Sequence, residues 1–103
     1  MDRARALADP ASFDEIADPV LRRVLRSYLV HGRLPVVPRG AKRSVLLAYL
    51  ATAFEPGVRY PEAAVNEIVA VWNPDFAALR RYLIDERLLA RQDGEYWRCG
   101  GWI

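Results

Sequence analysis

The sequence predicts a mainly α-helical domain with a small β-hairpin, and three observations within residues 55–98 predict it. Residues 61–72 have helical periodicity, and so does the stretch that begins at residue 76. Only Asn73-Pro74-Asp75 separates these two predicted helices. A short apolar ribbon follows the second helix and closes over Asp93-Gly94, a pair typical of two-residue hairpin turns. This order of elements predicts a winged helix-turn-helix, preceded here by an N-terminal amphipathic helix.

Length and composition are those of one small globular domain. The 103 residues, 52% of them hydrophobic, can bury one core but not two. Cys99 is the only cysteine, which excludes an intrachain disulfide and a cysteine-based zinc cluster. No apolar run approaches the roughly 18 residues of a membrane span, and the N-terminus lacks the apolar centre of a signal peptide. We therefore expect a cytoplasmic location.

Charge is distributed in three zones. Residues 1–18 contain five acids and two arginines, and so form an acidic segment. Residues 19–43 carry a charge of +7 with no acid at all, from Arg22, Arg23, Arg26, Arg33, Arg39, Lys42 and Arg43. Residues 44–103 contain eight acids and six arginines. The positive charge therefore precedes the predicted helix-turn-helix, which is itself slightly acidic.

Two Asp-Pro pairs mark the starts of the N-terminal helices. Asp9-Pro10 and Asp18-Pro19 each place a capping side chain before a proline that fits the first helical position. The first helix, about 10–17, belongs to the acidic segment 1–18. The winged-helix-like domain, 19–103, then begins with a basic helix over 19–31, whose apolar half-wheel opposes its arginines. We expect that helix to end at Gly32.

The remaining elements follow from prolines, glycines and periodicity. Residues 32–41 form a connector, because Pro35 and Pro38 exclude a helix there. Residues 42–54 are almost wholly apolar, which is typical of a central buried helix. Residues 58–60 have room for one short strand before Pro61 opens the next helix. In the last helix we expect a core stripe of Phe76, Leu79 and Leu83.

Three polar residues in this region are expected to be structural. Asp75 is placed to cap the last helix. Asn66 projects close to an apolar face, where an unpaired amide would cost about 1–3 kcal/mol, so we expect it to bond a neighbouring loop. Arg80 projects beside the core and should bond an acid or loop carbonyls from another helix.

The outward face of the last helix carries the candidate DNA contacts Ala77, Arg81 and Tyr82. Arg81 has a second interpretation of equal weight, a surface ion pair with Asp85 one turn later. In the hairpin, Arg91 and Arg98 flank a tip that contains Asp93 and Glu95, so the charges there cancel.

Residues from about 32 to 98 resemble a bacterial domain-of-unknown-function family. Its members are small stand-alone proteins or are fused behind winged-helix regulators of the arsenic-repressor type. No single residue or motif carries the resemblance, but the set as a whole is specific. It consists of Gly32-Arg33-Leu34, Pro38, Lys42-Arg43, the Phe54 to Gly57 turn, Tyr60, Glu62, Val65-Asn66, Asp75-Phe76, Leu79-Arg80-Arg81, Leu83, Asp85, Leu88-Leu89, Arg91 and Tyr96. Pro61 stands where the family has serine or threonine. The resemblance implies an association with transcription regulation and no named activity.

No residue pattern favours catalysis. His31 is the only histidine and lies at a predicted helix end, where a cation is favourable. Cys99 has no histidine near it in the sequence. Hydrolase, metalloprotease and nucleotide-binding motifs are absent from the sequence. We therefore expect a non-enzymatic protein with no cofactor and no metal.

Two functional hypotheses remain. In the first, the chain is a DNA-binding regulator whose last helix enters the major groove while the hairpin arginines and the 22–43 basic block hold phosphates. In the second, the winged helix is a scaffold for protein interaction, and the apolar face of the basic helix packs on a partner or on a second copy. Only the first hypothesis requires the basic block and the last helix to lie on the same face of the molecule.

Overall fold

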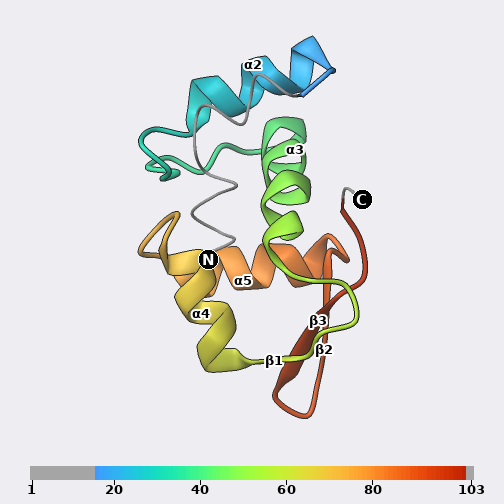
Figure 1. Ribbon diagram of the computed structural model, residues 1–103. Coiled ribbons are helices and arrows are strands. Elements are labelled where there is room, and N and C mark those ends of the chain that lie inside the picture. The colour runs from blue at the N-terminus through green and yellow to red at the C-terminus, as the bar shows by residue number, and fades with distance from the viewer. Residues whose placement is uncertain (1–15, 102–103) are drawn as a thin grey trace.

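The computed structural model describes residues 16–101 (Figure 1). This part of the chain contains four α-helices and one three-stranded antiparallel sheet. The helices are α2 (Pro19–Tyr28), α3 (Ala41–Leu50), α4 (Glu62–Ala70) and α5 (Phe76–Asp85), with a 3-10 turn, η2, at Ala51–Ala53. The strands are β1 (Tyr60–Pro61), β2 (Leu89–Gln92) and β3 (Glu95–Arg98). Residues 10–15 of the predicted helix at 10–17 lie outside the described residues, and Ile16 and Ala17 are not helical.

The sheet is formed mainly by the predicted hairpin. β2 and β3 pair antiparallel, with Gln92 opposite Glu95, and β1 adds to the other edge of β3. The connecting residues Asp93 and Gly94 have φ angles of 53° and 77°. Both angles are positive, as a two-residue turn that matches the twist of its strands requires. The Asp-Gly pair therefore closes the hairpin where the sequence predicted it.

α3 stands at the centre of the molecule, with α2 at one end and α4, α5 and the sheet at the other (Figure 1). Its side chains Leu46, Leu47 and Leu50 are almost wholly buried. They meet one hydrophobic core that also contains buried residues from the other elements, namely Leu25, Leu34, Phe54, Val65, Val69, Trp72, Leu79, Leu83, Leu89 and Tyr96. The near absence of polar residues in the second half of α3 follows from this central position.

Several predicted boundaries need correction. α2 ends at Tyr28, not near residue 31, because Val30 and Arg33 exchange two backbone hydrogen bonds across a tight turn. His31 and Gly32 form that turn with φ angles of 50° and 76°, so His31 lies outside the helix. The predicted helix 42–54 begins at Ala41 and tightens into the 3-10 turn after Leu50. α4 is also shorter than predicted, because it ends at Ala70.

The connector between α2 and α3 is pinned to the turn between α4 and α5. Leu34 is fully buried, and its backbone N–H donates to the Trp72 carbonyl at 2.7 Å. The Asn73 side-chain Nδ2 donates to the Leu34 carbonyl at 2.7 Å. These contacts join segments almost forty residues apart and hold α2 against the rest of the domain.

Most of the wide apolar face of α2 packs against the core of the same molecule. Leu25 is fully buried, and Leu21, Val24 and Tyr28 pack partly buried against the core. Val20 remains 63% exposed near the start of the helix.

The prediction that Phe76 lies in the core is wrong. Phe76 is 38% exposed, because it is the first residue of α5 and projects beyond the packed region. No helix within residues 16–101 combines the length and the apolar character that crossing a membrane requires.

Candidate nucleic-acid interface

α5 lies across the molecule (Figure 1). One side of this helix is exposed to solvent. The Asp75 side chain accepts from the backbone N–H of Ala78 at 3.3 Å and so caps its first turn. Leu79 and Leu83 are buried, which leaves Ala77 and Arg81 exposed on another side of the helix. This is the arrangement that helical periodicity requires of a helix with one buried stripe.

A shallow depression lies between α5 and the hairpin. It has a volume of about 330 Å³ and is lined by Ala77, Arg80, Arg81 and Ile84 from α5, Arg91 from β2 and Tyr96 from β3. The structure thus brings together three of the predicted DNA contacts, Ala77, Arg81 and Arg91. Arg81 and Arg91 are exposed, and among the described residues neither forms an ion pair. The predicted pair of Arg81 with Asp85 is therefore not formed.

One wall of the depression is held by a network of polar side chains. The Tyr96 hydroxyl donates to the Glu62 carboxylate at 2.6 Å, and Arg80 Nε lies 3.8 Å from the same oxygen. Arg80 Nη1 donates to Asn66 Oδ1. Asn66 thus bonds a helix side chain rather than the loop we expected. The network joins α4, α5 and β3, so it fixes the hairpin relative to the two helices.

The network also shifts the pKa of two of its members. The Tyr96 hydroxyl and the positive charge of Arg80 hold the pKa of Glu62 below its usual value. Burial, together with the bond to Glu62, raises the pKa of Tyr96. Each shift favours the state that makes the bond, an ionised carboxylate and a protonated phenol. The contact therefore persists across the neutral pH range.

Arg81 is also linked to the start of α3, through the Tyr82 ring. The Arg81 guanidinium lies 5.5 Å from the centre of the Tyr82 ring, and the Arg43 guanidinium lies 4.2 Å from the same ring. Arg43 Nε is also 3.9 Å from Glu86 Oε2. Next to it, Lys42 Nζ lies 5.8 Å from the Tyr28 ring of α2. The Tyr82 side chain was predicted on the outward face of this helix, but it is half-buried and two arginines lie beside its ring.

These contacts define one continuous basic strip. It runs from the hairpin over α5 to the first turn of α3 and consists of Arg91, Arg81, Tyr82 and Arg43, and it ends at the neighbouring Lys42, which contacts Tyr28 of α2. Arg43 is half-buried and has a packing role beside Glu86, so the exposed cations of the strip are Arg91, Arg81 and Lys42. Exposed acids lie near the strip, at Asp85 on α5 and at Asp93 and Glu95 around the hairpin tip.

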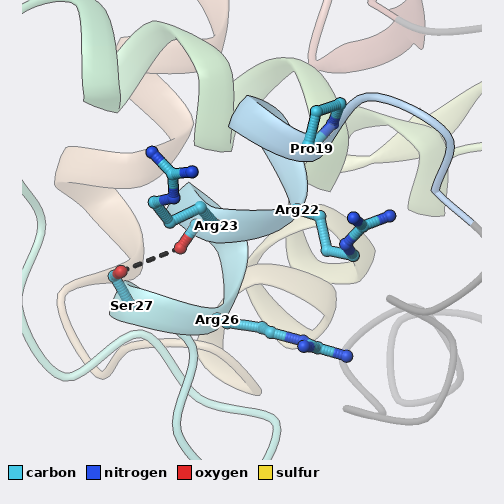
Figure 2. Close-up of a pocket in the computed structure, with 5 residues that line it drawn as sticks. All are labelled: Pro19, Arg22, Arg23, Arg26 and Ser27. Carbon is cyan, nitrogen blue, oxygen red and sulfur yellow. Dashed lines mark hydrogen bonds between the residues drawn. The ribbon is translucent and has the colours of Figure 1, made fainter.

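The arginines of α2 form a separate group. Arg22, Arg23 and Arg26 line their own depression, together with Pro19 and Ser27, and none of its lining residues belongs to α5 or the hairpin (Figure 2). Arg22 and Arg26 point to one side of the helix, and Arg23 points to another (Figure 2). Arg22 Nη1 donates to the Ile16 carbonyl at 2.7 Å. The predicted basic block is thus divided: Arg43 contacts α5, Lys42 contacts α2, and the first three arginines stay on α2.

Three further predicted contacts lie off the strip. Arg33 and Arg39 are exposed, the first in the turn after α2 and the second just before α3. Arg98 is half-buried, and its Nε donates to the Gly100 carbonyl at 3.0 Å. Its Nη1 donates to the Phe54 carbonyl at 3.4 Å. The Arg98 guanidinium is therefore engaged in holding β3 against the 3-10 turn region, and we leave it out of the candidate interface.

Sequence reasoning missed two residues. Arg59 stacks over Trp97 at 4.2 Å and covers part of β3. Asn73 donates to Leu34, as described above, and its Oδ1 accepts from the Asp75 N–H at 2.8 Å. For Asn73 a signal exists, because Asn-Pro-Asp between two helices favours side-chain bonds to the turn backbone. For Arg59 no local pattern points to a tryptophan 38 residues away.

Comparison with known proteins identifies the family of this chain. No curated protein and no solved structure matches it. A family model, DUF2087, described as an uncharacterized protein conserved in bacteria, matches residues 33–98. This range contains the whole basic strip and all of α3, α4, α5 and the sheet, whereas α2 precedes it. Because the match covers well over half of the sequence, the chain belongs to the DUF2087 family of conserved bacterial proteins.

Proposed function

We propose that this chain is a DNA-binding regulatory domain that places α5 against duplex DNA. The observation that carries the proposal is the continuity of the basic strip. Arg81 on α5 shares a depression with Arg91 of the hairpin and shares the Tyr82 ring with Arg43 of α3. A helix flanked on both sides by cations is suited to enter a groove between two phosphate backbones.

The order of the elements supports the same function. From α3 onward the chain runs helix, strand, helix, helix, strand, strand, and the sheet has the order β1-β3-β2. This order is typical of winged helices, in which the second helix of the helix-turn-helix reads bases and the hairpin lies beside it. In such an arrangement α5 is the reading helix. The fold by itself does not assign a function, so the charges of the strip are needed as well.

The contacts expected of α5 divide into two kinds. Arg81 can donate to a base edge or to a phosphate, and Ala77 offers a small apolar surface one turn earlier. Arg91 and Lys42 would contact phosphates on either side. The exposed acids around the hairpin tip disfavour contact there, so the hairpin would approach DNA through the side of β2 that carries Arg91. No step in this proposal requires catalysis or a cofactor.

The salt dependence of binding tests this proposal. Exposed cations that neutralise two or three phosphates give a slope of log affinity against log salt of about −2 to −3. We would measure it by fluorescence anisotropy of a labelled mixed-sequence duplex between about 50 and 200 mM KCl. Lys42→Gln, Arg81→Gln and Arg91→Gln should each make the slope shallower, by up to about one. The matched control Arg23→Gln, on α2, should leave it unchanged. Binding that is absent at the lowest salt, or a flat slope, would refute the proposal.

A protein-interaction module that uses α2 has less support. The width of the apolar face on α2 was the reason to consider it, and the packing of Leu21, Val24 and Leu25 against the core now accounts for most of that width. A single exposed valine, Val20, is a common feature of protein surfaces. A dimeric mass by sedimentation at micromolar concentration would restore this alternative.

A further inference from the structure

We propose that the depression between α5 and the hairpin is a built subsite for one phosphate group, held jointly by Arg81 and Arg91. The inference rests on the proposed function where that phosphate belongs to a DNA backbone. It goes further because it assigns two side chains, from two elements, to the same ligand. Surface cations that merely lie near each other would instead contact separate phosphates.

The guanidinium groups are arranged for a shared ligand. Arg81 and Arg91 line the depression from its two sides, one from α5 and one from β2. Each lies within the roughly 6 Å reach of a cation–π contact, Arg81 over Tyr82 at 5.5 Å and Arg91 over Tyr96 at 5.9 Å. Among the described residues neither guanidinium forms an ion pair, so its N–H groups are available to a ligand. Guanidinium N–H groups form paired hydrogen bonds to phosphate oxygens.

The depression also has a fixed wall and an apolar floor. Arg80 is held by Asn66 and Glu62, so its positive charge stays in place when no ligand is present. Ala77, Ile84 and the Tyr96 ring supply the apolar surface. A fixed charge does not need to be ordered on binding. This strengthens the attraction for an anion.

The charge and size of the depression favour a phosphate over a larger ligand. Three arginines line the depression. The carboxylate of Glu62 contacts its wall, but that carboxylate is already bound by the Tyr96 hydroxyl and lies beside Arg80. The positive charge therefore exceeds the negative. The volume of about 330 Å³ is near the lower limit of the roughly 300–1,000 Å³ of small-molecule pockets. A phosphate with its adjoining sugar fits this space.

A double-mutant cycle distinguishes one shared phosphate from two separate ones. Arg81→Gln and Arg91→Gln should each weaken duplex binding about tenfold, the effect of losing a charged hydrogen bond. Because both arginines hold the same group, the double variant should be far less than 100-fold weaker, roughly 10- to 20-fold. The control pair Arg81→Gln with Lys42→Gln should multiply to about 100-fold. Circular dichroism would check that the exposed substitutions leave the fold intact. Full multiplication in the Arg81 and Arg91 pair would overturn the shared site.

A titration with inorganic phosphate separates a DNA phosphate from a free one. The Arg81 and Arg91 Nε–Hε signals in NMR spectra should shift together and saturably with phosphate, but not with chloride of equal ionic strength, and Arg91→Gln should abolish the shift of Arg81. If phosphate binds in this way but duplex DNA does not, the subsite stands and the DNA-binding function fails. If DNA binds with the expected salt slope, but phosphate moves neither signal and the cycle multiplies, the DNA-binding function stands and the shared subsite fails.

Discussion

Tyr96 and Glu62 show how a few polar atoms position a whole hairpin. The phenol is buried and donates to a carboxylate that also faces Arg80. β3 is thereby tied to α4 and α5 through one oxygen atom, and the depression that carries Arg81 and Arg91 keeps its shape. Sequence spacing alone cannot predict this contact, because Glu62 and Tyr96 are 34 residues apart.

The state of Glu62 should make stability depend on pH. Its folded pKa lies below the ordinary value of 4.5, so its stabilising effect is fully present above that value and is lost as the pH falls through the folded pKa. Glu62→Gln should therefore lower the free energy of unfolding more at pH 7 than at about pH 3. Urea unfolding followed by tryptophan fluorescence at both values would measure the difference. An equal loss at both pH values would contradict this assignment.

Asn73 should be a stability determinant despite its position in a turn. Its amide makes two hydrogen bonds to backbone, to the Leu34 carbonyl and the Asp75 N–H. Asn73→Ala should lower the free energy of unfolding by about 1–3 kcal/mol, since it leaves partly buried backbone groups unpaired. Gln92→Ala, at an exposed strand position, should change it by less than about 0.5 kcal/mol. Equal effects in urea unfolding would show that the Asn73 bonds contribute nothing.

At the scale of elements, the connector after α2 is as important as the helices. Leu34 is fully buried, and Val36, two residues later, is 65% exposed. Leu34→Ala should therefore cost about 2–5 kcal/mol through lost burial and the cavity it leaves. Val36→Ala, the matched control in the same connector, should cost less than about 0.5 kcal/mol. Thermal unfolding of the two variants tests whether the connector is a packed part of the domain. A small effect at Leu34 would mean that α2 is held by its own contacts with α3 alone.

The helices, the hairpin and some helix starts could be predicted, but the C-terminal ends of the helices could not. The hairpin follows from Asp93-Gly94, and the start of α5 follows from the cap Asp75. The end of α2 is set by backbone pairing between Val30 and Arg33, which competes with one more helical turn. Phe76 has the right period for the core but stands at the first residue of α5, where packing has not begun. Local periodicity records which side of a helix is apolar, not where along its length the neighbours lie.

At the scale of the whole molecule, the arrangement of charge depends on contacts that only the fold creates. The sequence indicates a basic block at 22–43 as one unit. The fold divides it, because α2 lies at the end of α3 away from the sheet while Arg43 reaches α5 across the Tyr82 ring (Figure 1). The grouping of Arg81 with Arg91 likewise depends on how β2 packs beside α5. Charge counts along a chain therefore predict how many cations are present, but not which of them share a surface.

Amide chemical-shift mapping tests whether duplex DNA binds to α5 and the basic strip. Labelled protein would be titrated with a short mixed-sequence duplex at low salt, where non-specific contacts form. The largest shifts should cluster in residues 77–85 of α5, around Arg91 of β2 and around Lys42 at the start of α3, with small shifts around Arg23. Shifts concentrated on α2, or no shifts while the protein remains folded, would contradict this mode of binding.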